Sequence, residues 1–164
     1  MKVAALSLIA LAFSAAAPSV QAQVTQSRKV LTLEGAKLVA AAASAEAKRG
    51  NEGASIAIVD DGGNLMYLER IQPTFPMGAT ISTEKARTAA LFQKPTKILE
   101  DAIVSGRTPL LNAWSAPLNG GEPIVVDGQV VGAIGVSGAS SAARDAVIAT
   151  AGAAAMRGQT SATR

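Results

Sequence analysis

The stretch from Gly120 to Gly138 most constrains how this chain can fold. Two runs rich in β-branched residues flank the dipeptide Asp127-Gly128, which is typical of two-residue hairpin turns. The second run contains three regularly spaced glycines, at positions 132, 135 and 138. Because glycine weakens a strand, these three glycines indicate close approach of another backbone, a helix or a ligand. The stretch therefore predicts a hairpin and a candidate binding face in one place.

The N-terminus has the features of a secretory signal. Lys2 precedes the apolar run Val3–Ala17, and Val20-Gln21-Ala22 supplies the small residues that a signal peptidase requires. A membrane anchor is the alternative, but the run is shorter than the roughly 20 apolar residues that a span needs. We therefore expect cleavage after Ala22, a periplasmic or secreted protein, and no membrane span.

Composition limits the chemistry that is open to the chain. It has 164 residues, a formal net charge of +3, and neither cysteine nor histidine. The weak positive charge, with no clustered basic face, argues against a nucleic-acid partner. Without Cys or His there is no disulfide, no thiolate metal site and no histidine base, zinc ligand or haem ligand. We expect no metal site.

The pattern of residues predicts one domain over 31–157, between a flexible mature N-terminus (23–30) and a flexible tail (158–164). Thr32 is placed to cap the first helix, and Pro95 to open the third. Two hairpins in the order helix, hairpin, two helices, hairpin, helix predict an α+β fold with a mainly antiparallel sheet. The expected helices are 33–49, 79–92, 96–104 and about 140–156, and the expected strands are 55–59, 65–71 and the two runs of the Asp127-Gly128 hairpin.

Five motifs occur in an order and spacing that resemble a known family. The chain resembles the GlcG/HbpS-type haem-binding (haem-degrading) family, which includes the C-terminal domain of PduO-type proteins, over about Leu31–Met156. The resemblance implies an α/β/α sandwich, a compact homo-oligomer that is often an octamer, and haem binding in some members. It fixes the fold better than the activity. The motifs are Ile56–Leu65, Ser82–Ala90, Phe92–Thr96, Gly120–Ile124 and Gly132–Gly138.

Lys85 is the leading candidate for a ligand-binding residue. On the predicted helix 79–92 it shares a face with Ile81, Thr88 and Phe92, which argues against a purely solvated position. Its ammonium group could hold a carboxylate or a haem propionate. The family's Lys-Ala-x-Thr-Ala pattern, which is intact here, supports this role. Ser82 and Thr88 either line the same site or bond back to their own helix.

The segment Asn119-Gly120-Gly121 is the second candidate. Its backbone N–H groups could form an anion-binding nest, or the glycines could simply give a flexible connection. Arg70 matches an arginine common in the family, and could pair with a carboxylate ligand or with a neighbouring subunit. Glu122 either protects a sheet edge or contributes a carboxylate to the site.

Haem coordination without histidine would need a tyrosine or a methionine. Met66, Tyr67 and Met77 are the candidates, and packing is the simpler role for all three. Met66 and Tyr67 point to opposite faces of a strand, so at most one of them faces a given pocket. Three aromatic residues either line an apolar pocket or fill the core: Phe75, Phe92 and Trp114.

Three functions follow from these residues. The first is an exported oligomer that binds a small anionic or planar ligand between helix 79–92 and Gly120-Gly121, with haem open as a cofactor. The second is an enzyme for a small organic acid, in which Lys85 orients the substrate, Glu84 or Glu122 is the base and the glycines stabilise an oxyanion. The third is a purely structural oligomer. The sequence favours the first.

Overall fold

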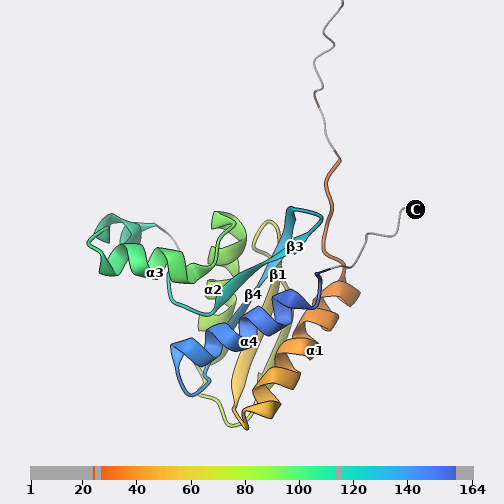
Figure 1. The fold of residues 1–164 in the computed structure, drawn as a ribbon, viewed down its shortest axis with the longest axis vertical. Helices are drawn as coiled ribbons and strands as arrows, with labels where there is room; N and C mark the ends of the chain where they lie inside the picture. The colour runs from red at the N-terminus through yellow and green to blue at the C-terminus, as the bar shows by residue number, and fades with distance from the viewer. Residues whose placement is uncertain (1–23, 25–26, 114–115, 158–164) are drawn as a thin grey trace, which may run out of the picture.

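Four antiparallel strands form the central sheet, in the order β2–β1–β4–β3 (Figure 1). β1 (Ala54–Asp60) and β2 (Leu65–Ile71) form the first predicted hairpin, and β3 (Gly121–Val126) and β4 (Gln129–Ser137) form the second. The two hairpins join because β1 also pairs with β4. Asp127 and Gly128 both have positive φ, as the predicted two-residue turn requires.

Helices cover both faces of this sheet, which confirms the α+β fold and the α/β/α sandwich (Figure 1). α1 (Leu33–Arg49) and α4 (Ala142–Ala154) lie on one face, and α2 (Gly78–Phe92) lies on the other. α3 (Thr96–Val104) and the 3₁₀ helix η1 (Thr108–Asn112) follow α2. The Thr32 hydroxyl accepts a hydrogen bond from the Gly35 N–H at 3.1 Å, so the predicted cap of α1 is present.

The computed structural model describes residues 24, 27–113 and 116–157. The predicted signal peptide (1–22), the tail (158–164) and Trp114 lie outside these ranges. Arg28 pairs with Asp61 and Lys29 with Asp127, so the start of the domain contacts the turns of both hairpins. Within the described ranges, no helix is both long and apolar enough to cross a bilayer.

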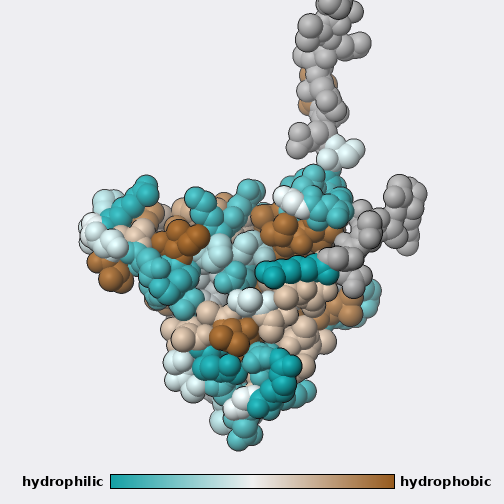
Figure 2. Space-filling view, in the orientation of Figure 1, coloured by the Kyte–Doolittle hydropathy of each residue, from teal (hydrophilic) through white to brown (hydrophobic). Residues whose placement is uncertain are grey.

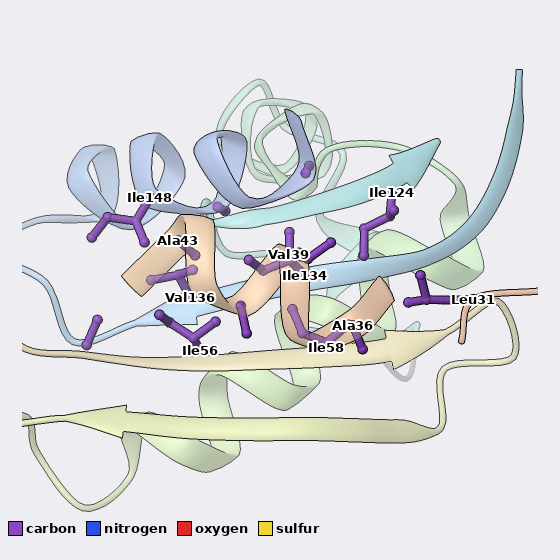
Figure 3. Close-up of a cluster of buried hydrophobic side chains, with 14 of the residues drawn as sticks. Leu31, Ala36, Val39, Ala43, Ile56, Ile58, Ile124, Ile134, Val136 and Ile148 are labelled. Carbon is purple, nitrogen blue, oxygen red and sulfur yellow. The ribbon is translucent and has the colours of Figure 1, made fainter. Parts of the chain in front are cut away.

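The main core lies between the sheet and the α1/α4 pair (Figure 3). Alternate residues of β1 and β4 point into it, and fully burying each of these side chains contributes about 1.5–3 kcal/mol. α1 and α4 present mostly alanine and valine, so both helices approach the sheet closely. The largest fully buried side chains are Ile56, Ile58, Ile124, Ile134, Ile148, Val39 and Val136.

The opposite face is packed by small residues. A Cβ atom on Gly135 would lie 2.0 Å from the carbonyl oxygen of Ser82 and 2.5 Å from the backbone nitrogen of Ala86. Only glycine therefore lets α2 lie this close to β4. The predicted close approach at the strand glycines is confirmed here, and the approaching group is a helix.

Two details differ from the sequence-based expectation. The buried face of α2 is centred on Ser82, Ala86 and Ala89, whereas Phe92 is exposed and Ile81 is only half-buried. The face is set by close contact with β4, which favours small side chains over large apolar ones. Residues 108–112, which lie outside the helices and strands expected from the sequence, form the 3₁₀ helix η1.

Candidate functional site

Lys85 and Asp145 form a buried ion pair between α2 and α4. The Lys85 Nζ atom lies 3.0 Å from Asp145 Oδ2 and donates a hydrogen bond to the Val136 carbonyl oxygen at 2.9 Å. The two side chains are 4% and 8% exposed. The other carboxylate oxygen, Oδ1, accepts from the Ala139 N–H at 3.0 Å. The ammonium group predicted to hold a ligand is therefore engaged within the chain.

Burial dominates the electrostatics of this pair. It raises the pKa of the Asp145 carboxyl above its ordinary value, while the nearby Lys85 charge and the hydrogen bonds from Lys85 and Ala139 oppose the shift. Asp145 is a residue that the sequence reasoning missed. The available signal is its place on the buried stripe of α4, beside Ile148 and Ala149, where a charged side chain needs a partner.

The predicted glycine segment packs directly on this ion pair. A Cβ atom on Gly120 would lie 3.0 Å from Lys85 Nζ, and one on Gly121 would lie 2.5 Å from the Lys85 carbonyl oxygen. The Gly121 N–H donates to the Thr96 hydroxyl at 2.9 Å, and the Asn119 N–H donates to the Glu100 carboxylate at 3.2 Å. The two amides thus have partners within the chain.

Ser82 and Thr88 both bond back to their own helix. Ser82 donates to the Ala79 carbonyl oxygen at 3.0 Å, and Thr88 donates to that of Glu84 at 2.8 Å. Thr88 also accepts from the Ala116 N–H at 2.8 Å, which ties the loop before β3 to α2. Of the predicted site residues, the structure thus brings together Lys85, Thr88, Asn119, Gly120 and Gly121 as a polar centre, whose role toward a ligand stays a prediction.

Arg70 and Met77 lie away from this polar centre. Arg70 is exposed near the end of β2, and Met77 is exposed immediately before α2. Ser82 lies one turn beyond the start of α2, between the two groups. The predicted residues therefore divide into the Lys85–Asp145 centre and a second group around the N-terminus of α2.

The groups proposed for catalysis are not assembled at one site. Glu84 pairs with Arg87 at 2.7 Å. Glu122 lies opposite Ile134 in the β3–β4 pairing and so faces the α1/α4 layer, where burial raises the pKa of its carboxyl and the charge of Arg157 opposes the shift. The Lys85 charge is also paired, with Asp145. Lys85, Glu84 and Glu122 therefore do not combine into a free nucleophile–base pair.

The remaining candidates for haem or metal ligands are dispersed. Met66 and Tyr67 both pack against the main core, not on opposite faces as strand alternation predicts, and the β1–β2 register shifts beside them, between Ile58 and Val59. Met77 is exposed. Among the described residues, no group of three or more acidic side chains could hold a metal ion. Phe75 and Phe92 are both exposed, so neither fills the core.

An apolar hollow of about 410 Å³ lies between α3, η1 and the segment that leads to β3. Among the described residues that line it, the one charged group is the Glu100 carboxylate, which already accepts a hydrogen bond from the Asn119 N–H. It would suit the apolar part of a ligand better than an anionic group. The lining residues are Glu100, Ile103, Val104, Leu111, Ala116, Pro117 and Leu118.

Comparison with known proteins places this geometry in context. A family model described as "Haem degrading protein HbpS-like" matches residues 31–154. Protein GlcG of Escherichia coli K12 is 44% identical over 113 residues, covering 68% of this chain and 84% of GlcG. These similarities confirm the resemblance drawn from the motifs.

Solved structures share the same architecture. A double mutant of Streptomyces reticuli HbpS superposes with a TM-score of 0.73 at 33% identity, covering 85% of this chain and 97% of that one. Klebsiella pneumoniae protein ORFY superposes with a TM-score of 0.77 at 27% identity, covering 85% of this chain and 99% of that one. The shared fold therefore covers 85% of this chain and nearly the full length of each of the two solved chains.

Proposed function

Because the chain belongs to the HbpS-like family, whose model is described as haem-degrading, we propose that it is an exported, oligomeric protein that binds a small anionic or planar ligand. The observation that carries this proposal is that the groups required for catalysis are engaged within the chain. The Lys85 ammonium, which would orient a substrate, is held by Asp145 and the Val136 carbonyl, and Glu84, a candidate base, is paired with Arg87. Binding requires no reactive pair and can use donors other than Lys85. Binding therefore agrees with the site better than catalysis.

Haem would be held differently here than by an axial histidine, because the chain contains none. Coordination would require Tyr67 or a methionine, and otherwise haem would bind through its propionates and by apolar contact. A small organic acid needs only hydrogen-bond donors and a positive charge. We propose the small anion as the principal ligand class and haem as the alternative.

Export and oligomerisation complete the proposal. The predicted signal peptide supports export. Large apolar side chains are exposed on and after α3, including Val104 at 82%, and Figure 2 shows hydrophobic surface over this helix. Large apolar side chains that are exposed close together favour burial against another protein surface, so they support self-association.

A ligand panel tests the proposed function. The mature protein is heated with hemin, and separately with a set of small carboxylic acids, and its Tm and oligomeric mass are measured. A ligand at 100 times its Kd stabilises the folded state by about 2.7 kcal/mol, which is easily seen as a rise in Tm. A Soret band that shifts with Tyr67→Phe would support coordinated haem. A large assembly that no member of the panel stabilises would contradict the proposal and favour a purely structural oligomer.

A further inference from the structure

Two buried hydroxyl groups have no hydrogen-bond partner among the described residues. They are Ser55 Oγ, on β1, and Thr74 Oγ1, in the segment between β2 and α2. Ser55 is 0% exposed. Leaving a buried hydroxyl unpaired costs about 1–3 kcal/mol, so each such group calls for an explanation.

Both hydroxyls lie beside Gly78, the first residue of α2. A Cβ atom on Gly78 would lie 2.8 Å from Ser55 Oγ and 3.2 Å from Thr74 Oγ1. A Cβ atom on Gly138 would lie 2.3 Å from Thr74 Oγ1. Because both positions are glycine, neither residue has a side chain that crowds the two hydroxyls.

The N-terminus of α2, beside these hydroxyls, has no side-chain cap. Met77 makes no side-chain capping bond, and the first turn of α2 contains no acidic residue. The Gly78 N–H donates a hydrogen bond to the Phe75 carbonyl, and the Ile81 N–H donates one to the Met77 carbonyl. The backbone N–H groups of residues 79 and 80 have no acceptor among the described residues. Free N–H groups at a helix N-terminus carry a partial positive charge and favour anions.

Arg70 adds a full positive charge on the same side of the sheet. It lies directly opposite Ser55 in the β1–β2 pairing, so the two side chains share a face, the one that α2 covers. Arg70 is exposed and has no ion pair within the described part of the chain. Phe75 and Met77 lie in the same segment as Thr74, are also exposed, and offer apolar contact to a ligand.

We propose that the N-terminus of α2, with the hydroxyls of Ser55 and Thr74 and the guanidinium of Arg70, binds the carboxylate of a small organic acid. This inference rests on the proposed function and names its ligand class. The hydroxyls and the first-turn amides donate to the carboxylate oxygens, and Arg70 neutralises the charge. Phe75 and Met77 contact the hydrocarbon part, so an organic acid binds more tightly than an inorganic anion.

Benzoate is a suitable probe, with inorganic phosphate as the comparison anion. Titration of the ¹⁵N-labelled mature oligomer should shift the amide signals of residues 78–80 first. Arg70→Gln should weaken benzoate binding about tenfold, because it removes a charge-assisted contact. Arg107→Gln, which removes another exposed arginine beyond the C-terminal end of α3, is the matched control and should leave the affinity unchanged.

Ser55→Ala separates a binding role from a structural one. It removes a buried hydroxyl without a partner, so the Tm of the free protein should not fall, while benzoate affinity should drop about fivefold. A lower Tm with unchanged affinity would overturn the proposal, since it would show that Ser55 serves packing. Thr74→Val gives a second, nearly isosteric test of the same kind.

The remaining outcomes distinguish the location from the function. If neither Arg70→Gln nor Ser55→Ala weakens benzoate binding, this site is overturned but the proposed function is intact. The same holds if the protein binds hemin and no organic acid. Phosphate binding as tight as benzoate binding would overturn the organic-acid assignment. Stabilisation by no member of the panel would overturn both proposals.

Discussion

Replacing Lys85 by methionine should destabilise the protein strongly. Met fills most of the volume of the lysine stem, so the change mainly removes the charge and the bonds to Asp145 and Val136. It leaves a carboxylate that is 8% exposed with only the Ala139 N–H as a partner. Removing one partner of a buried ion pair costs about 3–5 kcal/mol. With a urea slope of about 2 kcal/mol per M, the midpoint should fall by ~2 M at pH 7.

A double-mutant cycle identifies the source of this loss. Asp145→Asn keeps an acceptor for the Ala139 N–H and removes the charge, so Lys85→Met combined with Asp145→Asn should lose less stability than Lys85→Met alone. Lys97→Met is the control, because Lys97 pairs with Asp101 on an exposed helix face, where an ion pair contributes less than about 1 kcal/mol. Unfolding is measured in urea at one fixed protein concentration.

The pH dependence gives an independent check of the same variant. Without Lys85, burial should raise the pKa of Asp145 further. A carboxyl with a raised pKa binds its proton more tightly in the folded state, so stability falls as pH rises through the acidic range. The deficit of Lys85→Met should therefore shrink at acid pH. A loss no larger than that of Lys97→Met, or a double mutant as unstable as the sum of its single mutants, would refute the role given to this pair.

Three further predictions concern the packing, the charges and the processing of the chain. The free energy of unfolding of Glu122→Gln should rise relative to that of wild type as pH rises from 4 to 7, because burial raises the pKa of Glu122. If urea unfolding gives the two proteins the same dependence of stability on pH, this prediction is wrong. Gly135→Ala should lower the free energy of unfolding by about 3 kcal/mol, because its Cβ would meet the α2 backbone. Gly62→Ala is the control and should cost far less, because its Cβ would lie near side-chain atoms only. Equal urea midpoints for these two variants would contradict the close contact at Gly135. Mass spectrometry of the exported protein should show residue 23 as its first residue, and an uncleaved mass would exclude the signal.

The fold followed closely from local sequence signals. The helix over residues 33–49 and the strand over 65–71 have the bounds that capping, turn chemistry and periodicity indicated. Each of these signals acts over a few residues and needs no knowledge of distant neighbours. The resemblance to the family supplied the layer arrangement, which the spacing of elements alone leaves open.

The site was harder to predict because it depends on contacts between distant segments. Lys85 was correctly placed away from solvent, but its partner Asp145 lies 60 residues later on another helix. The pairing of Ser55 with Arg70 follows from strand register, and the register of this hairpin shifts between Ile58 and Val59, an irregularity that the sequence pattern did not predict. The buried face of α2 differs from the predicted stripe because a glycine on β4 decides how that helix docks.

Native mass spectrometry of the protein isolated from cells that produce it tests the proposed binding function most directly. We predict an oligomer that carries a small non-covalent acid, released on denaturation, and reduced in occupancy by Arg70→Gln but unaffected by Arg107→Gln. Subunits that are isolated without bound small molecules, and that acquire none from an extract of the same cells, would contradict the proposed function.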